Sequence, residues 1–150
     1  MRVNELMTSQ VRVVAPSLSA REAWDIMRRD RIHHLLVADG GGLLGILSDK
    51  DAGGPNGAAV RDTATVGDLM TRQAVTIDAN ATVRRAANLM RGRTIGCLPV
   101  TDGGRTVGIV TVSDLLALLG HGVDRPARPA RAALHFRVPH RRQKSATGRW

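Results

Sequence analysis

The spacing of apolar residues along the chain predicts the same set of elements twice. An extended segment comes first, at Val11–Ala15 and again at Ala74–Asp78. Each is followed by apolar residues at the three- and four-residue spacing of an amphipathic helix. Ser19 and Glu22 form a capping-box pattern at the start of the first helix, and Thr82 occupies the cap position of the second.

Each half then predicts a β-hairpin, formed by two short apolar runs that an Asp-Gly turn connects. The runs are Ile32–Ala38 and Leu43–Ser48 in the first half, and Ile95–Thr101 and Thr106–Thr111 in the second. A last helix is predicted from Asp49 onwards in the first half and from Val112 onwards in the second. The expected order is β-α-β-β-α in each half, which is an α/β (α+β) fold.

The sequence itself repeats with an offset of 63 residues, which explains why the two halves predict the same elements. From Leu6 and Leu69 to Ala52 and Leu115 the match has no gap, and 17 of the 47 pairs are identical. We expect two modules packed face to face about a pseudo-twofold axis. Their boundaries are residues 1–52 and 66–120, with a linker at 53–65 and a tail at 121–150.

Composition limits the class of protein. Hydrophobic residues make up 43% of the chain, enough for a core, and the single cysteine, Cys97, excludes an internal disulfide. No apolar run approaches the ~20 residues of a membrane span, and the N-terminus lacks the apolar region of a signal peptide. We therefore expect a cytoplasmic protein that does not enter the membrane.

The net charge of +9 is concentrated at the C-terminus. Residues 121–150 carry 8 basic residues and one acidic residue, whereas residues 1–120 carry 14 basic and 12 acidic residues. The tail also has three prolines and no sustained periodicity, so we expect it to be disordered. A basic arm attracts nucleic acid by counterion release, which makes nucleic-acid binding an alternative function, although one that concerns the tail and not the fold.

The ordered phrases of the two repeats resemble the cystathionine-β-synthase (CBS) domain family. The second copy, from LMTRQAVTIDANATV to GIVTVSDLL, is close to the family pattern, and the first is looser, with Leu36 where the second has Pro99. The resemblance covers residues 3–119. It implies a disc-like pair of modules, a homodimer formed through helices, and clefts between the modules that bind adenosine-containing ligands.

The two aspartates that end the repeats are the first candidate ligand residues. The resemblance implies that Asp51 and Asp114 hold ribose and that Ser48 and Thr111 are the matching hydroxyls. A carboxylate near a helix N-terminus is favoured by the helix dipole and accepts hydrogen bonds from vicinal hydroxyls. The alternative is that each aspartate only caps a helix. The residues that precede them, expected to reach phosphate, are Lys50 and Ser113.

A histidine pair distinguishes the first repeat from the second. Because side chains alternate along a strand, His33 and His34 should point to opposite faces. The resemblance implies that this dipeptide lies at the cleft, where basic residues meet phosphate. The second repeat has Gly96 and Cys97 at these positions, which predicts two unequal clefts. The alternative is that His34 is a core residue and His33 is solvated.

Other functions find less support in the sequence. His33 or His34 with Cys97 across the pseudo-twofold axis would make a metal or redox sensor, but the set is small for zinc, and Cys97 is favoured as an apolar filler. No nucleophile elbow, P-loop or dinucleotide fingerprint is present, so we expect a regulatory protein and not an enzyme. The predicted ligand is AMP, ADP, ATP or S-adenosylmethionine, with no cofactor required. The regulated partner would be a separate protein or a second copy of the chain.

Overall fold

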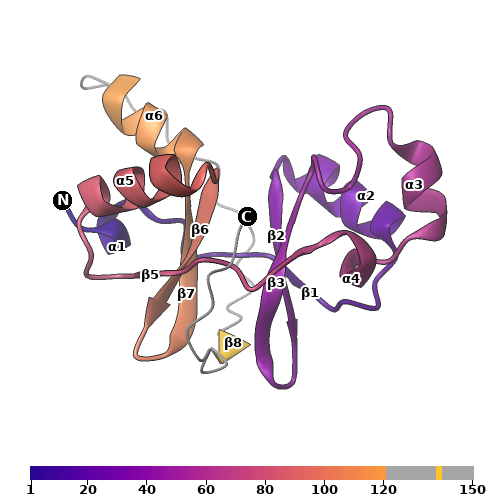
Figure 1. The fold of residues 1–150 in the computed structure, drawn as a ribbon, viewed down its shortest axis with the longest axis horizontal. Coiled ribbons are helices and arrows are strands. Elements are labelled where there is room, and N and C mark those ends of the chain that lie inside the picture. The colour runs from indigo at the N-terminus through magenta and orange to yellow at the C-terminus, as the bar shows by residue number, and fades with distance from the viewer. Residues whose placement is uncertain (121–137, 140–150) are drawn as a thin grey trace.

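The computed structural model describes residues 1–120 and 138–139. Two sheets lie side by side at the centre, with α2, α3 and α4 beyond one sheet and α1, α5 and α6 beyond the other (Figure 1). The first sheet and its helices comprise β1 (Val13–Val14), α2 (Ala20–Asp30), β2 (His34–Asp39), β3 (Gly42–Ser48), α3 (Ala58–Thr63), α4 (Val66–Leu69) and β4 (Thr71–Arg72). The second comprise α1 (Val3–Leu6), β5 (Ile77–Asp78), α5 (Val83–Arg93), β6 (Cys97–Asp102), β7 (Arg105–Thr111), α6 (Val112–Gly120) and β8 (Val138–Pro139). The predicted α/β class and the two-module arrangement are confirmed.

The strand order shows the repeat directly. The sheets have the orders β1-β2-β3-β4 and β5-β6-β7-β8, and in each the first pair is parallel and the others are antiparallel. Leu36 pairs with Ile46 in the first hairpin, and Pro99 pairs with Ile109 at the equivalent place in the second. Both predicted hairpins are therefore confirmed.

The two long helices start where their polar caps predict. The Ser19 Oγ accepts a hydrogen bond from the backbone N–H of Glu22 at 3.1 Å. The Thr82 Oγ1 does the same for the N–H of Arg85 at 3.1 Å. Each bond satisfies one of the N–H groups that a helix start leaves without an intrahelical partner.

The opening segment of each repeat packs on the other repeat. The N–H of Thr8 donates to the carbonyl of Ile109 at 2.9 Å, and the N–H of Ile109 donates back to Thr8 at 3.0 Å. At the equivalent position Thr71 of β4 pairs with Ile46 of β3. The two repeats therefore exchange their opening segments.

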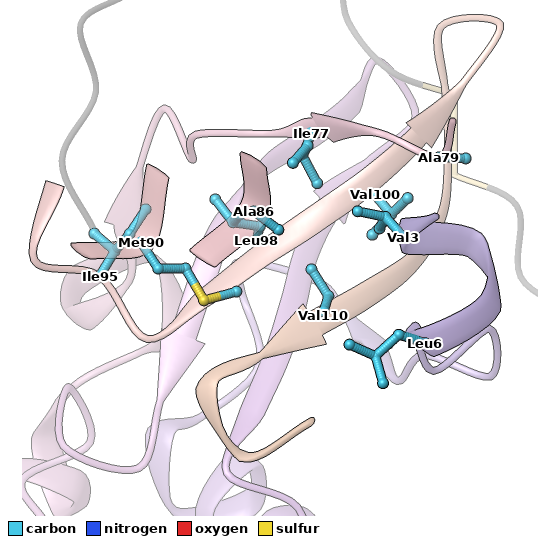
Figure 2. Packing of buried hydrophobic residues seen from close by; sticks show 10 residues of the cluster. All are labelled: Val3, Leu6, Ile77, Ala79, Ala86, Met90, Ile95, Leu98, Val100 and Val110. Carbon is cyan, nitrogen blue, oxygen red and sulfur yellow. The ribbon is translucent and has the colours of Figure 1, made fainter. Parts of the chain in front are cut away.

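Three apolar clusters hold the fold together. The core of the second repeat includes Val3 and Leu6 from the exchanged helix α1, as Figure 2 shows. Val66 and Met70 from the other exchanged segment are buried in the core of the first repeat in the same way. The third cluster joins the two sheets and consists of Val11, Leu36, Leu43, Ile46, Ala74 and Cys97.

The helix predicted from Asp49 onwards is wrong. Residues 49–57 form turns, because Gly53 and Gly54 adopt φ values of +89° and +64°, which interrupt a right-handed helix. The segment predicted as a linker contains α3, and α4 follows with a complete capping box between Thr65 and Asp68.

The expectations for the tail fall mostly outside the described residues. Disorder was predicted for residues 121–150, and nucleic-acid binding was the alternative function that concerned them; of these residues the structure describes only β8, paired with β7. Among the helices of residues 1–120, none combines the length and the apolar character needed to cross a bilayer.

Candidate ligand-binding site

A cavity of about 940 Å³ is lined by residues of both repeats. Its size falls within the range of small-molecule sites. All ten residues that the sequence singled out line it: His33, His34, Ser48, Lys50, Asp51, Gly96, Cys97, Thr111, Ser113 and Asp114. The fold therefore brings together side chains that lie up to 81 positions apart in the sequence.

Asp51 is held by the strand end that precedes it. Its Oδ2 accepts hydrogen bonds from the Ser48 N–H at 3.0 Å and from the Thr71 Oγ1 at 3.5 Å. The Asp51 N–H donates to the Ser48 Oγ at 3.0 Å. Within residues 1–120 and 138–139, the hydrogen bonds of this carboxylate all fall on Oδ2. Oδ1 remains an acceptor for a ligand hydroxyl.

Asp114 repeats this geometry in the second repeat. Its Oδ2 accepts from the Thr111 N–H at 2.8 Å and from the Thr111 Oγ1 at 3.0 Å, and the residue is only 2% exposed. Both aspartates thus cap the turn in which they lie. A carboxylate has about four lone-pair sites, so capping and ligand binding are compatible functions of one side chain.

The two histidines occupy different environments. The His33 side chain is 72% exposed, and its Nδ1 lies 2.9 Å from the Asp49 Oδ2. His34 is half-buried and pairs with Ser48 across the β2–β3 ladder. Burial, reinforced by the charge of His33, lowers the pKa of His34 against the opposing pull of the carboxylates of Asp49, Asp51 and Asp114. His34 is therefore mostly neutral at pH 7 and donates through one ring nitrogen.

The lowered pKa of His34 predicts a loss of stability in mild acid. Below the ordinary value of 6.5 the unfolded chain binds a proton at His34 that the folded chain does not yet bind. The free energy of unfolding should therefore fall as the pH drops below that value, by less than about 1.4 kcal/mol per pH unit for one proton. His34→Gln should remove this part of the slope in urea unfolding measured from pH 7 to pH 5.

His33→Gln is the matched control, because it changes the adjacent and exposed imidazole. It should leave most of the acid slope in place. An unchanged slope in His34→Gln would contradict the assignment.

Cys97 belongs to the third apolar cluster, which joins the two sheets. It is 1% exposed, and burial, followed by the charges of Asp114 and Asp51, raises the pKa of its thiol well above the ordinary value. A protonated, buried thiol is a poor nucleophile and a poor metal ligand. No group of three His, Cys, Asp or Glu side chains in the described part of the chain is arranged to hold a metal ion. The metal or redox alternative gains no support from this geometry.

The sequence prediction omitted Thr94 of the cavity and also the two threonines that end the repeated opening phrase. Thr8 and Thr71 line it, and Thr71 contacts Asp51 directly. Both end the repeated phrase LMT, so the repeat contained a signal for them. They were missed because each packs on the opposite repeat, Thr71 against Asp51 and Thr8 against Ile109, which only the exchange of opening segments reveals.

The fold defines a tandem-repeat module with a cavity between its two copies. The CBS domain model matches residues 3–52 and 66–121, and the chain therefore belongs to the CBS domain family. It is 33% identical over 114 residues to the CBS domain-containing protein YhcV of Bacillus subtilis, covering 75% of this chain and 81% of that protein.

Solved structures of CBS domain pairs have the same fold. The pair of protein MJ0100, in complex with 5′-methylthioadenosine and S-adenosyl-L-methionine, is 30% identical with a TM-score of 0.72, covering 80% of this chain and 96% of that one. CBSX2 in complex with AMP is 26% identical with a TM-score of 0.67, covering 79% and 95%. CBS domain pairs are regulatory modules that bind adenosine-containing ligands, as these two complexes illustrate.

Proposed function

We propose that this chain is a regulatory module that binds an adenosine-containing ligand, either an adenine nucleotide or S-adenosylmethionine, between its repeats. The observation that carries the proposal is the pair of carboxylates, Asp51 and Asp114, each fixed by a hydroxyl residue three positions earlier in one shared cavity. The ligands bound by the CBS pair of MJ0100 and by CBSX2 support it. The proposed role is regulatory and not catalytic.

The aspartates would bind the two ribose hydroxyls of the ligand. A carboxylate oxygen accepts from each hydroxyl in charge-assisted hydrogen bonds, which are stronger than neutral ones. Ser48 and Thr111 would hold the carboxylates in the required orientation, as they do in the free protein. The small side of the cavity at Gly96 leaves space for the adenine base, because nothing lies within 4 Å of a Cβ built there.

The two halves of the cavity would prefer different ligands. His33, His34 and Lys50 on the Asp51 side supply donors for phosphate oxygens. The equivalent residues of the second repeat, Gly96, Cys97 and Ser113, are neutral. We therefore expect the Asp51 half to favour a nucleotide and the Asp114 half to tolerate an uncharged 5′ substituent.

Ligand binding would be transmitted through the packing of the two repeats. A ligand shifts a conformational equilibrium only if it binds one arrangement more tightly than the other. Thr71 on the exchanged segment donates to Asp51 of the opposite repeat, so a ligand at Asp51 would act on a carboxylate that both repeats hold. The receiver of the signal would be a separate protein or a second copy of this chain.

The exposed face of α6 is the proposed homodimer contact. Val112, Leu116 and Leu119 follow one another at helical spacing and are 39%, 62% and 82% exposed. The double variant Leu116→Glu/Leu119→Glu should be monomeric in sedimentation velocity, whereas the wild-type chain should sediment as a dimer. Asn88→Glu adds a charge at an exposed position of α5, whose apolar face with Ala86 and Met90 is buried in the core, and this variant should remain dimeric. A monomeric wild type would refute this part of the proposal.

Thermal unfolding of the full chain with AMP, ADP, ATP or S-adenosylmethionine tests the proposed function. A ligand at about 100 times its dissociation constant adds about 2.7 kcal/mol to the free energy of unfolding. At least one ligand of the panel should raise the unfolding temperature, with a stabilisation that grows as the logarithm of the ligand concentration above the dissociation constant. A folded protein that responds to none of them would show that the proposal is wrong.

A further inference from the structure

A buried arginine of the first repeat lies outside the cavity described above. Arg61 on α3 is 4% exposed. Its Nη1 donates hydrogen bonds to the carbonyl oxygens of Ala52 at 2.8 Å and Gly54 at 2.5 Å. Its guanidinium carbon also lies 4.0 Å from the ring centroid of Trp24 on α2, a cation–π contact. The buried charge is therefore compensated by two carbonyl dipoles and one aromatic face.

The two carbonyls belong to the turn that directly follows Asp51. Three successive N–H groups of this turn donate to carbonyls three to five residues earlier. The pairs are Ala52 to Ser48 at 3.1 Å, Gly53 to Lys50 at 2.9 Å and Gly54 to Asp49 at 3.0 Å. The turn thus determines where the backbone of Asp51 and of its cavity-lining neighbours lies.

The second repeat stabilises the same stretch in another way. There the chain continues as α6, whose backbone hydrogen bonds extend from Val112 to Gly120 and include Asp114. In the first repeat Gly53 and Gly54 interrupt the helix, so no such ladder follows Asp51. The two hydrogen bonds from Arg61 hold the backbone carbonyls of Ala52 and Gly54, which have no such helix to stabilise them.

Trp24 is also specific to the first repeat. The equivalent position in the second repeat is Ala87. The indole packs at the edge of the first core and presents its ring to Arg61, while Arg28 lies 5.7 Å from the same ring. Trp24 therefore serves as the platform for the buried guanidinium and not as an isolated surface aromatic.

We infer that Arg61 is a positioning residue for the Asp51 half of the cavity, with Trp24 as its platform. The inference rests on the proposed function for the ligand, but its structural part stands on the hydrogen bonds alone. The hydrogen bonds and the ring contact of Arg61 within the described residues involve Ala52, Gly54 and Trp24, none of which lines the cavity, so Arg61 acts through Ala52 and Gly54. Within the described part of the chain, the hydrogen bonds of Arg61 are the only side-chain bonds from α3 to this turn. Without them the turn should be more mobile, and the Asp51 carboxylate should sample more orientations.

Two variants separate the charge from the aliphatic stem. Arg61→Met keeps a buried unbranched chain and removes both hydrogen bonds. It should weaken AMP binding at Asp51 about tenfold, as expected when a charged donor to two carbonyls is lost. Arg61→Lys keeps the charge but not the planar fork, so we expect it to restore part of the affinity. Binding is measured by calorimetry in the otherwise wild-type chain, with AMP as the ligand expected at the Asp51 half and S-adenosylmethionine as the comparison for the Asp114 half.

Amide hydrogen exchange without ligand provides the second readout. In Arg61→Met the amides of Ala52, Gly53 and Gly54 should exchange faster, while Leu36 in the β2–β1 ladder keeps its wild-type rate. Arg21→Met is the matched control, because Arg21 joins the same two helices through its exposed ion pair with Asp62. It should change neither the turn amides nor the affinity.

The outcomes distinguish this inference from the proposed function. If the turn amides are unaffected, or if the turn and Leu36 accelerate together, Arg61 does not position the turn and the inference is overturned. If wild type binds neither ligand, the proposed function fails, and the exchange data still decide whether Arg61 holds the turn. Equal affinities of wild type and Arg61→Met, with faster turn exchange, overturn the link to Asp51.

Discussion

Gly45→Ala should destabilise the protein by about 2–3 kcal/mol, the upper part of the range for overpacked sites. A Cβ at this position of β3 would lie 2.2 Å from the carbonyl oxygen of Thr71 and 3.3 Å from the Cα of Arg72. Both are backbone atoms of the exchanged strand β4, so a small side-chain rotation does not relieve the clash. The added methyl group must push β4 away from β3 and thereby separate the two repeats.

Gly108→Ala tests the same contact in the second repeat and should cost less. Its Cβ would lie 2.7 Å from the Sδ of Met7 and 2.8 Å from the carbonyl oxygen of Thr8. The methionine side chain is able to rotate away, although the Thr8 carbonyl must still shift. We therefore expect the order of destabilisation to be Gly45→Ala, then Gly108→Ala.

Gly92→Ala is the control for the loss of glycine itself. No atom lies within 4 Å of a Cβ built at Gly92, which belongs to α5. Alanine there should stabilise the helix by up to about 1 kcal/mol. Urea unfolding followed by circular dichroism measures all three variants. A Gly45→Ala protein as stable as wild type would show that β4 does not pack closely on β3.

Much of the local structure followed from the sequence because it depends on short-range chemistry. The Asp-Gly turns fixed both hairpins, and Ser19 and Thr82 marked the starts of the two long helices. The helix predicted from Asp49 failed for an equally local reason. Gly53 and Gly54 were assigned to a linker. Their positive φ values prevent a helix from continuing past the turn that contains Asp51.

The exchange of opening segments was not predictable from the residues. Val3 and Leu6 have the same apolar pattern whether their helix covers its own repeat or the other one. Which repeat the helix covers depends on the sheet edge that is available to it in three dimensions. The pattern of apolar residues along the chain does not specify that edge. For this reason the ten predicted cavity residues come from within each repeat, while Thr8 and Thr71 were missed.

Arg61 illustrates a second limit of sequence analysis. An arginine in a segment with glycine and proline is ordinarily solvated, and nothing in the local pattern marks it as buried. Only the position of Trp24 on α2 and of the carbonyls after Asp51 creates a site for its guanidinium. Buried polar residues of this kind are set by tertiary structure, so they are visible only in the fold.

The largest functional effect is expected for the aspartates. Asp51→Ala should weaken nucleotide binding at its half of the cavity by at least about 100-fold, since each hydrogen bond to a charged group contributes roughly 1.5–3 kcal/mol and ribose offers two hydroxyls. The ligand-induced rise in unfolding temperature should then disappear for the nucleotide that needs Asp51. Asp114→Ala should have the same effect on the ligand of the other half.

Both substitutions also remove a cap, which must be separated from the loss of binding. Without Asp51 or Asp114 the N–H of Ser48 or Thr111 loses its acceptor, which costs about 0.5–2 kcal/mol in the absence of ligand. Asp51→Asn and Asp114→Asn keep one acceptor oxygen for this cap and remove the charge. We expect the asparagine variants to unfold near the wild-type temperature without ligand and still show no ligand-induced rise.

The comparison of the two halves tests the proposed difference in ligand preference. One outcome is that Asp51→Asn abolishes the rise in unfolding temperature with AMP or ATP, while Asp114→Asn abolishes the rise with S-adenosylmethionine. The phosphate donors His33, His34 and Lys50 then explain the difference. If either variant abolishes both responses, the two halves of the cavity act as one site. If the responses survive in both variants, the carboxylates serve only as caps, and the ligand site must lie elsewhere in the chain.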